Sequence, residues 1–114
     1  MDRLRRYILS YTAYGKEPLH LLISSALSRG LCATEREMVP PLVALAQDGL
    51  LEADSHTGRS GDPYQPETQV TEGDLLSYIE RNRKAGFASY PEEGGEYFFR
   101  ASRSGRKWLK NNPD

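Results

Sequence analysis

Asp54, Ser55 and His56 are the residue types of a hydrolytic triad, and they follow one another directly in the sequence. Adjacent residues at the end of a strand point in different directions, so these three cannot form a hydrogen-bonded triad by themselves. The other histidine, His20, stands in an apolar segment, and no pair of Cys or His has the spacing of metal ligands. No glycine-rich loop joins a strand to a helix in phosphate-binding form. We therefore expect a protein that is not an enzyme and that uses no cofactor or metal ion.

Two groups of cationic side chains could instead contact nucleic acid. The segment "RNRK", residues 81–84, stands at the end of a predicted helix, where cations are also stabilised by the helix dipole. A second group lies in the last fifteen residues, close in sequence to the glutamates of residues 92–96, which could neutralise it. Because a charge run is more often a solvated face, the sequence leaves both interpretations open. The candidates for nucleic-acid binding are Arg81, Arg83, Lys84, Arg103, Arg106 and Lys107.

Acidic residues and tyrosines point to a protein partner instead. The polar residues around the predicted third helix are Glu35, Arg36, Glu37, Gln47 and Asp48. Such a surface repels phosphate, which favours contact with protein or a purely structural helix. The chain also has seven tyrosines, a residue type enriched at interfaces because it combines a large rigid area with a polar tip. Tyr64 and Tyr90 stand at predicted loop or strand-end positions, where they could contact a partner or simply anchor the loop. The protein-binding candidates are Glu35, Glu37, Tyr64 and Tyr90.

Length and composition are those of one small folded domain, covering residues 1–114. The chain has 114 residues, 38% of them hydrophobic and 27% charged, and a net charge of −1. A near-neutral molecule has no long-range attraction for polyphosphate, so any contact with nucleic acid must rest on local patches. A single cysteine, Cys32, excludes an internal disulfide framework. No apolar run is long enough to span a bilayer and the N-terminal segment is too polar for a signal peptide, so we expect a cytoplasmic protein without a membrane partner.

Three helices are predicted in the first half of the chain. Apolar residues recur at helical spacing from Leu4 to Tyr11, in a helix ending near Gly15, and again over residues 19–27, in a helix that follows Pro18 and closes at Gly30. In the third, a capping box at residues 34–37 is followed by two prolines, which predicts a break near Val39 and a regular helix over residues 40–48. Gly49 is expected to take the left-handed conformation that ends this helix.

The second half is predicted to mix strands, a loop and two helices. "LLEAD" forms a short strand, residues 55–70 a surface loop, and residues 72–85 an extra helix that opens with a capping box. The segments "FASY" and "EYFFRA" flank "PEEGG" as a hairpin, and strand alternation places Tyr97, Phe99 and Ala101 on one face. A closing helix is anchored by Trp108 and Leu109.

The three helices, "DGLLEAD", "EYFFRAS" and "SGRKWL" together resemble the winged helix-turn-helix superfamily. The resemblance implies an α+β fold of about five short helices with a small antiparallel β-sheet. The segment between the two matched strands is far longer than a simple wing. The sequence can therefore be matched to the winged-helix arrangement in a second way. In that match, residues 75–87 form the presenting helix, "FASYPEEGGEYFFRA" forms a compact wing, and the first three helices form an added platform.

The function expected from these patterns is that of a non-catalytic macromolecule-binding module, such as a protein-interaction adaptor, regulator or small antagonist. Its partner would be another protein, a second copy of this chain included. The alternative is a winged-helix transcriptional regulator that binds double-stranded DNA. The two functions require different surfaces, so the placement of the candidate residues decides between them.

Overall fold

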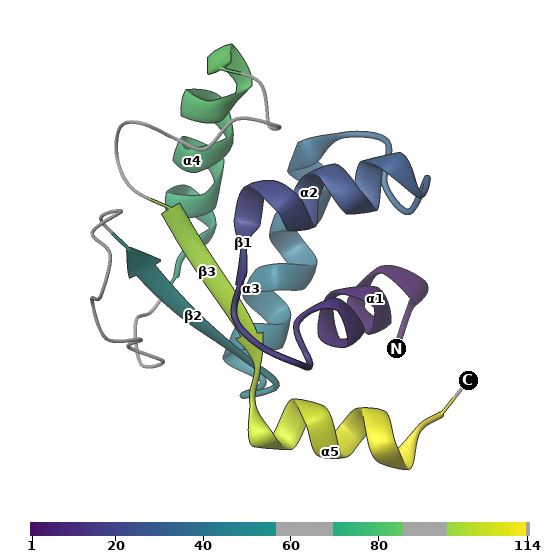
Figure 1. Cartoon of the computed structure of the whole chain (residues 1–114). Helices are drawn as coiled ribbons and strands as arrows, with labels where there is room; N and C mark the ends of the chain where they lie inside the picture. The colour runs from purple at the N-terminus through teal and green to yellow at the C-terminus, as the bar shows by residue number, and fades with distance from the viewer. Residues whose placement is uncertain (57–69, 86–95, 114) are drawn as a thin grey trace.

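The computed structural model describes residues 1–56, 70–85 and 96–113, and Figure 1 shows how their elements are arranged. These residues form five α-helices, one 3₁₀ helix and three strands, which confirms the expected α+β class. The helices are α1 (Arg3–Tyr11), α2 (Leu19–Ser28), η1 (Glu35–Met38), α3 (Val39–Gln47), α4 (Glu72–Ala85) and α5 (Arg103–Asn111). The strands are β1 (Glu17–Pro18), β2 (Leu51–His56) and β3 (Glu96–Ala101).

The three strands form an antiparallel sheet in the order β1-β3-β2. Strand β3 pairs over its whole length with β2, from Leu51 opposite Ala101 to His56 opposite Glu96, and its other edge pairs with the two-residue β1. Strand β2, which follows the third helix, is therefore the direct partner of β3. The hairpin partner expected in "FASY" and most of the expected loop lie outside the described residues.

One face of the sheet supplies the floor of the hydrophobic core. Phe99 and Ala101 of β3 are fully buried, together with Ala53 opposite Phe99 and Leu51 opposite Ala101. Tyr97 packs at the edge of the same core, so the predicted alternation along this strand is confirmed. Buried residues of α1, α2, α3 and α4 complete the cluster. The core thus joins the inserted helix α4 to the first three helices and the sheet.

Helices α2 and α3 both end at a glycine with positive φ. The angle is 71° at Gly30 and 75° at Gly49, a region in which a side chain would strain the backbone. After each glycine the chain folds back: the amide of Leu31 donates to the carbonyl of Ala26 at 3.0 Å, and the amide of Leu50 donates to that of Leu45 at 3.0 Å. These are the bonds of a Schellman cap, and the conformation expected at Gly49 is confirmed.

The proline pair coincides with a change of helix type. The capping box at Thr34 and Glu37 opens the 3₁₀ helix η1, which ends at Met38, and α3 begins at Val39, so the break expected near Val39 is confirmed. The regular helix starts one residue earlier than predicted, with both prolines in its first turn. The amides of a first turn have no acceptor within the helix, so the missing N–H groups cost nothing there.

Helix α4 has the bounds predicted for the extra helix. The Thr71 amide donates to Asp74 Oδ2 at 3.0 Å, and the Asp74 amide donates to Thr71 Oγ1 at 3.1 Å, which are the two reciprocal bonds of a capping box. The inward residues Leu75, Tyr78 and Ile79 are buried. Helix α4 is therefore an internal part of the core, although it is inserted between β2 and β3 in the sequence.

Candidate functional site

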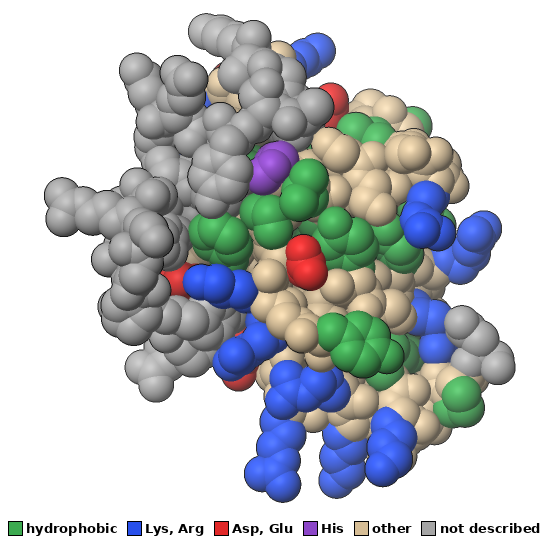
Figure 2. Space-filling view, in the orientation of Figure 1, with side chains coloured by type: hydrophobic (Ala, Val, Ile, Leu, Met, Phe, Trp, Pro, Cys, Tyr) green, Lys and Arg blue, Asp and Glu red, His purple; other side chains and the backbone are tan. Residues whose placement is uncertain are grey.

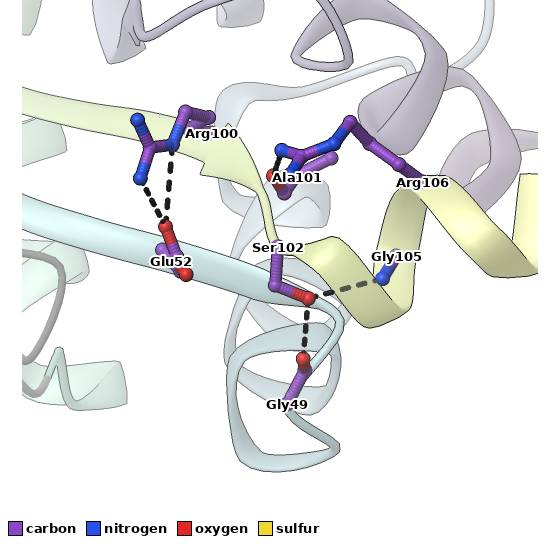
Figure 3. Close-up of polar contacts among 7 residues, drawn as sticks. All are labelled: Gly49, Glu52, Arg100, Ala101, Ser102, Gly105 and Arg106. Atoms are coloured by element: carbon purple, nitrogen blue, oxygen red, sulfur yellow. Dashed lines mark hydrogen bonds and ion pairs between the residues drawn. The ribbon is translucent and has the colours of Figure 1, made fainter.

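Helix α5 is held against the corner between α3 and β2 by Ser102, as Figure 3 shows. The Ser102 hydroxyl donates to the Gly49 carbonyl at 2.6 Å and accepts from the Gly105 amide at 3.0 Å, so it caps α5 and ties the helix to the end of α3. The Ser102 amide donates to the Leu50 carbonyl at 3.0 Å. Gly105 is buried where α5 crosses Leu50, and Trp108 and Leu109 pack on the edge of the core. The other face of α5 is left to solvent.

That outer face is cationic. Figure 2 shows Lys and Arg side chains gathered over α5 at the lower edge of the molecule. Arg106 is partly engaged, because its Nη1 donates to the Ala101 carbonyl at 2.8 Å. Arg100, from the same C-terminal group, instead donates to Glu52 Oε2 at 2.8 Å across the sheet. An open hollow of about 650 Å³ runs along α5 and is lined by Arg103, Ser104, Arg106, Lys107, Lys110 and Asn111.

Helix α1 extends this positive charge. Arg6 Nη1 donates to the Asn112 carbonyl, and its guanidinium lies 5.1 Å from the centre of the Trp108 ring. The two helices contain three and four Lys or Arg residues, seven in all, and no acidic residue between them. Asp2, the N-cap of α1, accepts from the Arg5 amide at 2.8 Å. We call the surface formed by the outer residues of both helices the α1–α5 basic surface: Arg3, Arg6, Arg103, Arg106, Lys107 and Lys110.

The two cationic groups singled out in the sequence do not share a face. Arg81 and Arg83 are exposed on α4, and α4 and α5 lie at opposite ends of the molecule (Figure 1). The side chain of Lys84 lies outside the described part of the chain. Asn82, which belongs to the "RNRK" segment expected at a surface, is only 3% exposed and donates to the Tyr78 carbonyl at 2.8 Å. Because Asn82 turns toward the core, it cannot meet a base edge.

Acidic residues outnumber cations around the third helix, where Arg36 is the one cation of η1 and α3. Glu37 accepts hydrogen bonds from the amides of Thr34 and Ala33, which hold the pKa of its carboxyl below the usual range and commit it to the cap. Glu35 is half-buried, and α3 itself has the sequence "VPPLVALAQ", without Lys or Arg. On this helix Pro40 and Gln47 are exposed. This surface offers little to a phosphate backbone.

The tyrosines divide between the core and the surface. Tyr64 and Tyr90 lie outside the described residues. Tyr78 is fully buried, and the Tyr7 hydroxyl is hydrogen-bonded to Ser25 Oγ. Tyr14 is 100% exposed, and no sequence pattern marks it as a site. It stands three residues after Tyr11 and would face inward on a longer helix, but α1 ends at Tyr11.

The groups that could do chemistry are separated from one another or turned inward. Asp54 is 3% exposed on β2, and within the described residues no donor reaches its Oδ2, while the side chains of Ser55 and His56 are not described. Burial, with Glu37 and Glu35 nearby, raises the pKa of the Cys32 thiol, so the reactive thiolate is disfavoured. In residues 1–56, 70–85 and 96–113 no three His, Cys, Asp or Glu side chains gather as a metal site. None of the helices in those ranges is long and apolar enough to cross a membrane.

No protein family, curated protein or solved structure matches the chain. Three surfaces of the protein itself are the candidates for binding a partner. These are the apolar helix α3 with its acidic neighbours, the exposed Tyr14, and the α1–α5 basic surface.

Proposed function

We propose that this protein is a non-catalytic binding module of winged-helix-like build and that its partner is another protein. The order α1-β1-α2-α3-β2 followed by β3, with the strands arranged β1-β3-β2, is compatible with the winged-helix arrangement that the sequence resembles. In that arrangement α3 is the helix that would be presented to a DNA groove. The chemistry of α3 is therefore the feature that separates the two candidate functions.

The single observation that carries the proposal is that α3 has no group able to read DNA apart from Gln47. Helices that enter the major groove present Arg, Lys, Asn, Gln or Ser to base edges and are flanked by cations that meet phosphate. Here the flanking residues include Glu35, Glu37 and Asp48. The inserted helix α4 also packs against both η1 and α3, so a duplex would have less room to approach. These features favour a protein partner.

Tyr14 is the residue we assign to this contact. A fully exposed tyrosine ring on the turn between α1 and β1 offers a rigid apolar area with a hydroxyl at its tip, the kind of side chain that dominates binding at interfaces. The backbone of Tyr14 lies on a short turn between helix α1 and strand β1, so little backbone entropy is lost when a partner covers the ring.

The second candidate function is duplex DNA binding, and the segregation of charge favours it. Seven cations on α1 and α5, with no acid in either helix, could follow a phosphate backbone although the whole chain carries a net charge of −1. Such contacts position a protein on DNA without reading its sequence. This candidate predicts binding through α5 and away from α3.

Titration with pooled random duplexes tests the DNA candidate. We expect a dissociation constant no tighter than about 10 μM near physiological salt, because only backbone contacts are available. If α5 makes these contacts, Lys107→Ala should lower the slope of log affinity against log salt by about one unit. Arg83→Ala, at the opposite end of the molecule, is the charge-matched control and should leave the slope unchanged. Selection of a defined DNA site bound at nanomolar concentration would overturn the protein-partner proposal.

Affinity capture from nuclease-treated lysate tests the protein partner. The wild-type chain should retain a defined partner after nuclease treatment and at a salt concentration that releases DNA. Tyr14→Ala should weaken that capture by about tenfold or more, as expected for loss of a central aromatic contact. Leu21→Ala, which truncates another exposed apolar side chain, is the control for non-specific hydrophobic binding. Equal loss in both variants, or no partner for the wild type, would contradict the proposal.

A further inference from the structure

A pocket between α1 and the end of α2 has the lining of an anion site. It is an open depression of about 440 Å³, lined by Arg3, Arg6, Tyr7, Ser10, Arg29 and Leu31. We propose that this arginine pocket binds a phosphate monoester whose phosphoryl group is held by Arg3 and Arg29 and whose organic part lies against Tyr7 and Leu31. The proposal is independent of the partner proposed above, because none of these residues belongs to α3, α4 or the turn that carries Tyr14.

The pocket is positively charged, and two of its arginines, Arg3 and Arg29, have no acidic partner among the described residues. Three of its six lining residues are arginines and none is acidic. Arg3 and Arg29 are exposed, and among the described residues no carboxylate lies within ion-pair distance of either. The nearest acid in the sequence, Asp2, faces the Arg5 amide and guanidinium instead. Guanidinium groups stay protonated at all physiological pH values and can donate two parallel hydrogen bonds to phosphate oxygens.

Arg6, Arg29 and Tyr7 of this pocket already make contacts within the protein. Arg6 is anchored to α5 through the Asn112 carbonyl and the Trp108 ring, so it forms a fixed wall. Arg29 lies with its guanidinium 5.4 Å from the centre of the Tyr7 ring, and the Tyr7 hydroxyl is hydrogen-bonded to Ser25. A site whose side chains are held before binding loses less conformational entropy when the ligand enters. Helix α1 and the residues that follow α2 thus supply the two halves of the site.

The size and lining indicate more than a bare ion. A volume of about 440 Å³ falls within the range of pockets that hold small organic molecules. Tyr7 and Leu31 offer an apolar wall, and the exposed residue Ser10 adds a polar side chain. A phosphate ester with a compact ring or alkyl group matches both parts of the lining. Such a group could come from a phosphorylated side chain or from a free metabolite, since the chemistry at the arginines is the same.

The test is a nuclear magnetic resonance titration of the full chain with phenyl phosphate. Amide shifts should change around α1 and the end of α2, and phenyl phosphate should bind more tightly than inorganic phosphate or phenyl sulfate, which lack the ring or the second charge. Arg3→Gln and Arg29→Gln should each weaken binding by about tenfold, as for loss of one charge-assisted pair. Acetyl-phosphotyrosine amide and glucose 6-phosphate, run as separate arms, distinguish a phosphorylated side chain from a sugar ester.

Arg103→Gln is the matched control, because it removes the same charge from the α5 hollow. It should leave the affinity for phenyl phosphate within about twofold of wild type. If all three variants weaken binding equally, or if the shifts map to α5, the arginine pocket is not the site and the proposal fails. The spectra report folding at the same time, so a variant that lost its structure would be recognised before its affinity was compared.

Discussion

Gly105→Ala should destabilise the protein by about 3 kcal/mol, at the upper end of the cost of overpacking a well-filled site. A Cβ on this residue would lie 2.1 Å from the Leu50 carbonyl oxygen and 3.3 Å from Leu9 Cδ2. The first distance is far below van der Waals contact, so α5 or the turn after α3 would have to move. The free energy of unfolding, measured by urea denaturation, is the quantity to compare.

The backbone at this crossing has little freedom to yield. The Leu50 carbonyl already accepts from the Ser102 amide, and the Ser102 hydroxyl joins the Gly49 carbonyl to the Gly105 amide (Figure 3). A shift of α5 large enough to admit a methyl group would therefore lengthen several hydrogen bonds together. The expected cost thus includes part of the helix cap as well as the clash.

Gly15→Ala is the control for this substitution. A Cβ on Gly15 would meet no atom within 4 Å apart from its chain neighbours, and its φ is not positive, so the variant should be neutral or slightly more stable than wild type. If Gly105→Ala unfolded at the same urea concentration as Gly15→Ala, the close approach of α5 to Leu50 would be refuted.

Tyr78→Ala should cost about 4 kcal/mol, in the range for truncating a large aromatic side chain in a core. Tyr78 is fully buried on α4, and its ring meets that of Tyr97 edge to face at 5.7 Å between centroids. The substitution would open a cavity between the inserted helix and the sheet. Thermal or urea unfolding measures the loss, and a single cooperative transition is expected for both proteins.

Tyr14→Ala provides the matched comparison, since it removes the same side chain from a fully exposed position. Its free energy of unfolding should stay within about 0.5 kcal/mol of wild type. A small effect at position 78, or a separate transition for α4 in the wild-type chain, would mean that the insertion is appended to the core and does not share it.

The sequence by itself determined the elements whose signals are local. Capping boxes at residues 34–37 and 71–74 place the starts of η1 and α4, and Gly30 and Gly49 end α2 and α3 in the predicted conformation. Each signal acts over four or five residues, through bonds between a side chain and the nearest free amides or through the range of φ that glycine can reach. The alternation in β3 is equally local, and it correctly separated Phe99 and Ala101 from their neighbours.

Only the tertiary structure decided which surfaces the candidate residues form. Arg3 and Arg29 come together because α1 packs against α2, and α4 and α5 stand apart because α4 is inserted between two paired strands. The requirement for glycine at position 105 comes from Leu50, 55 residues earlier, and no local pattern signals it. Asn82 is a polar residue in a basic segment, yet it turns inward to the carbonyl of Tyr78. These outcomes depend on contacts between residues distant in sequence. A pattern of charges or of helical spacing along the chain does not tell which other element will pack over a given residue.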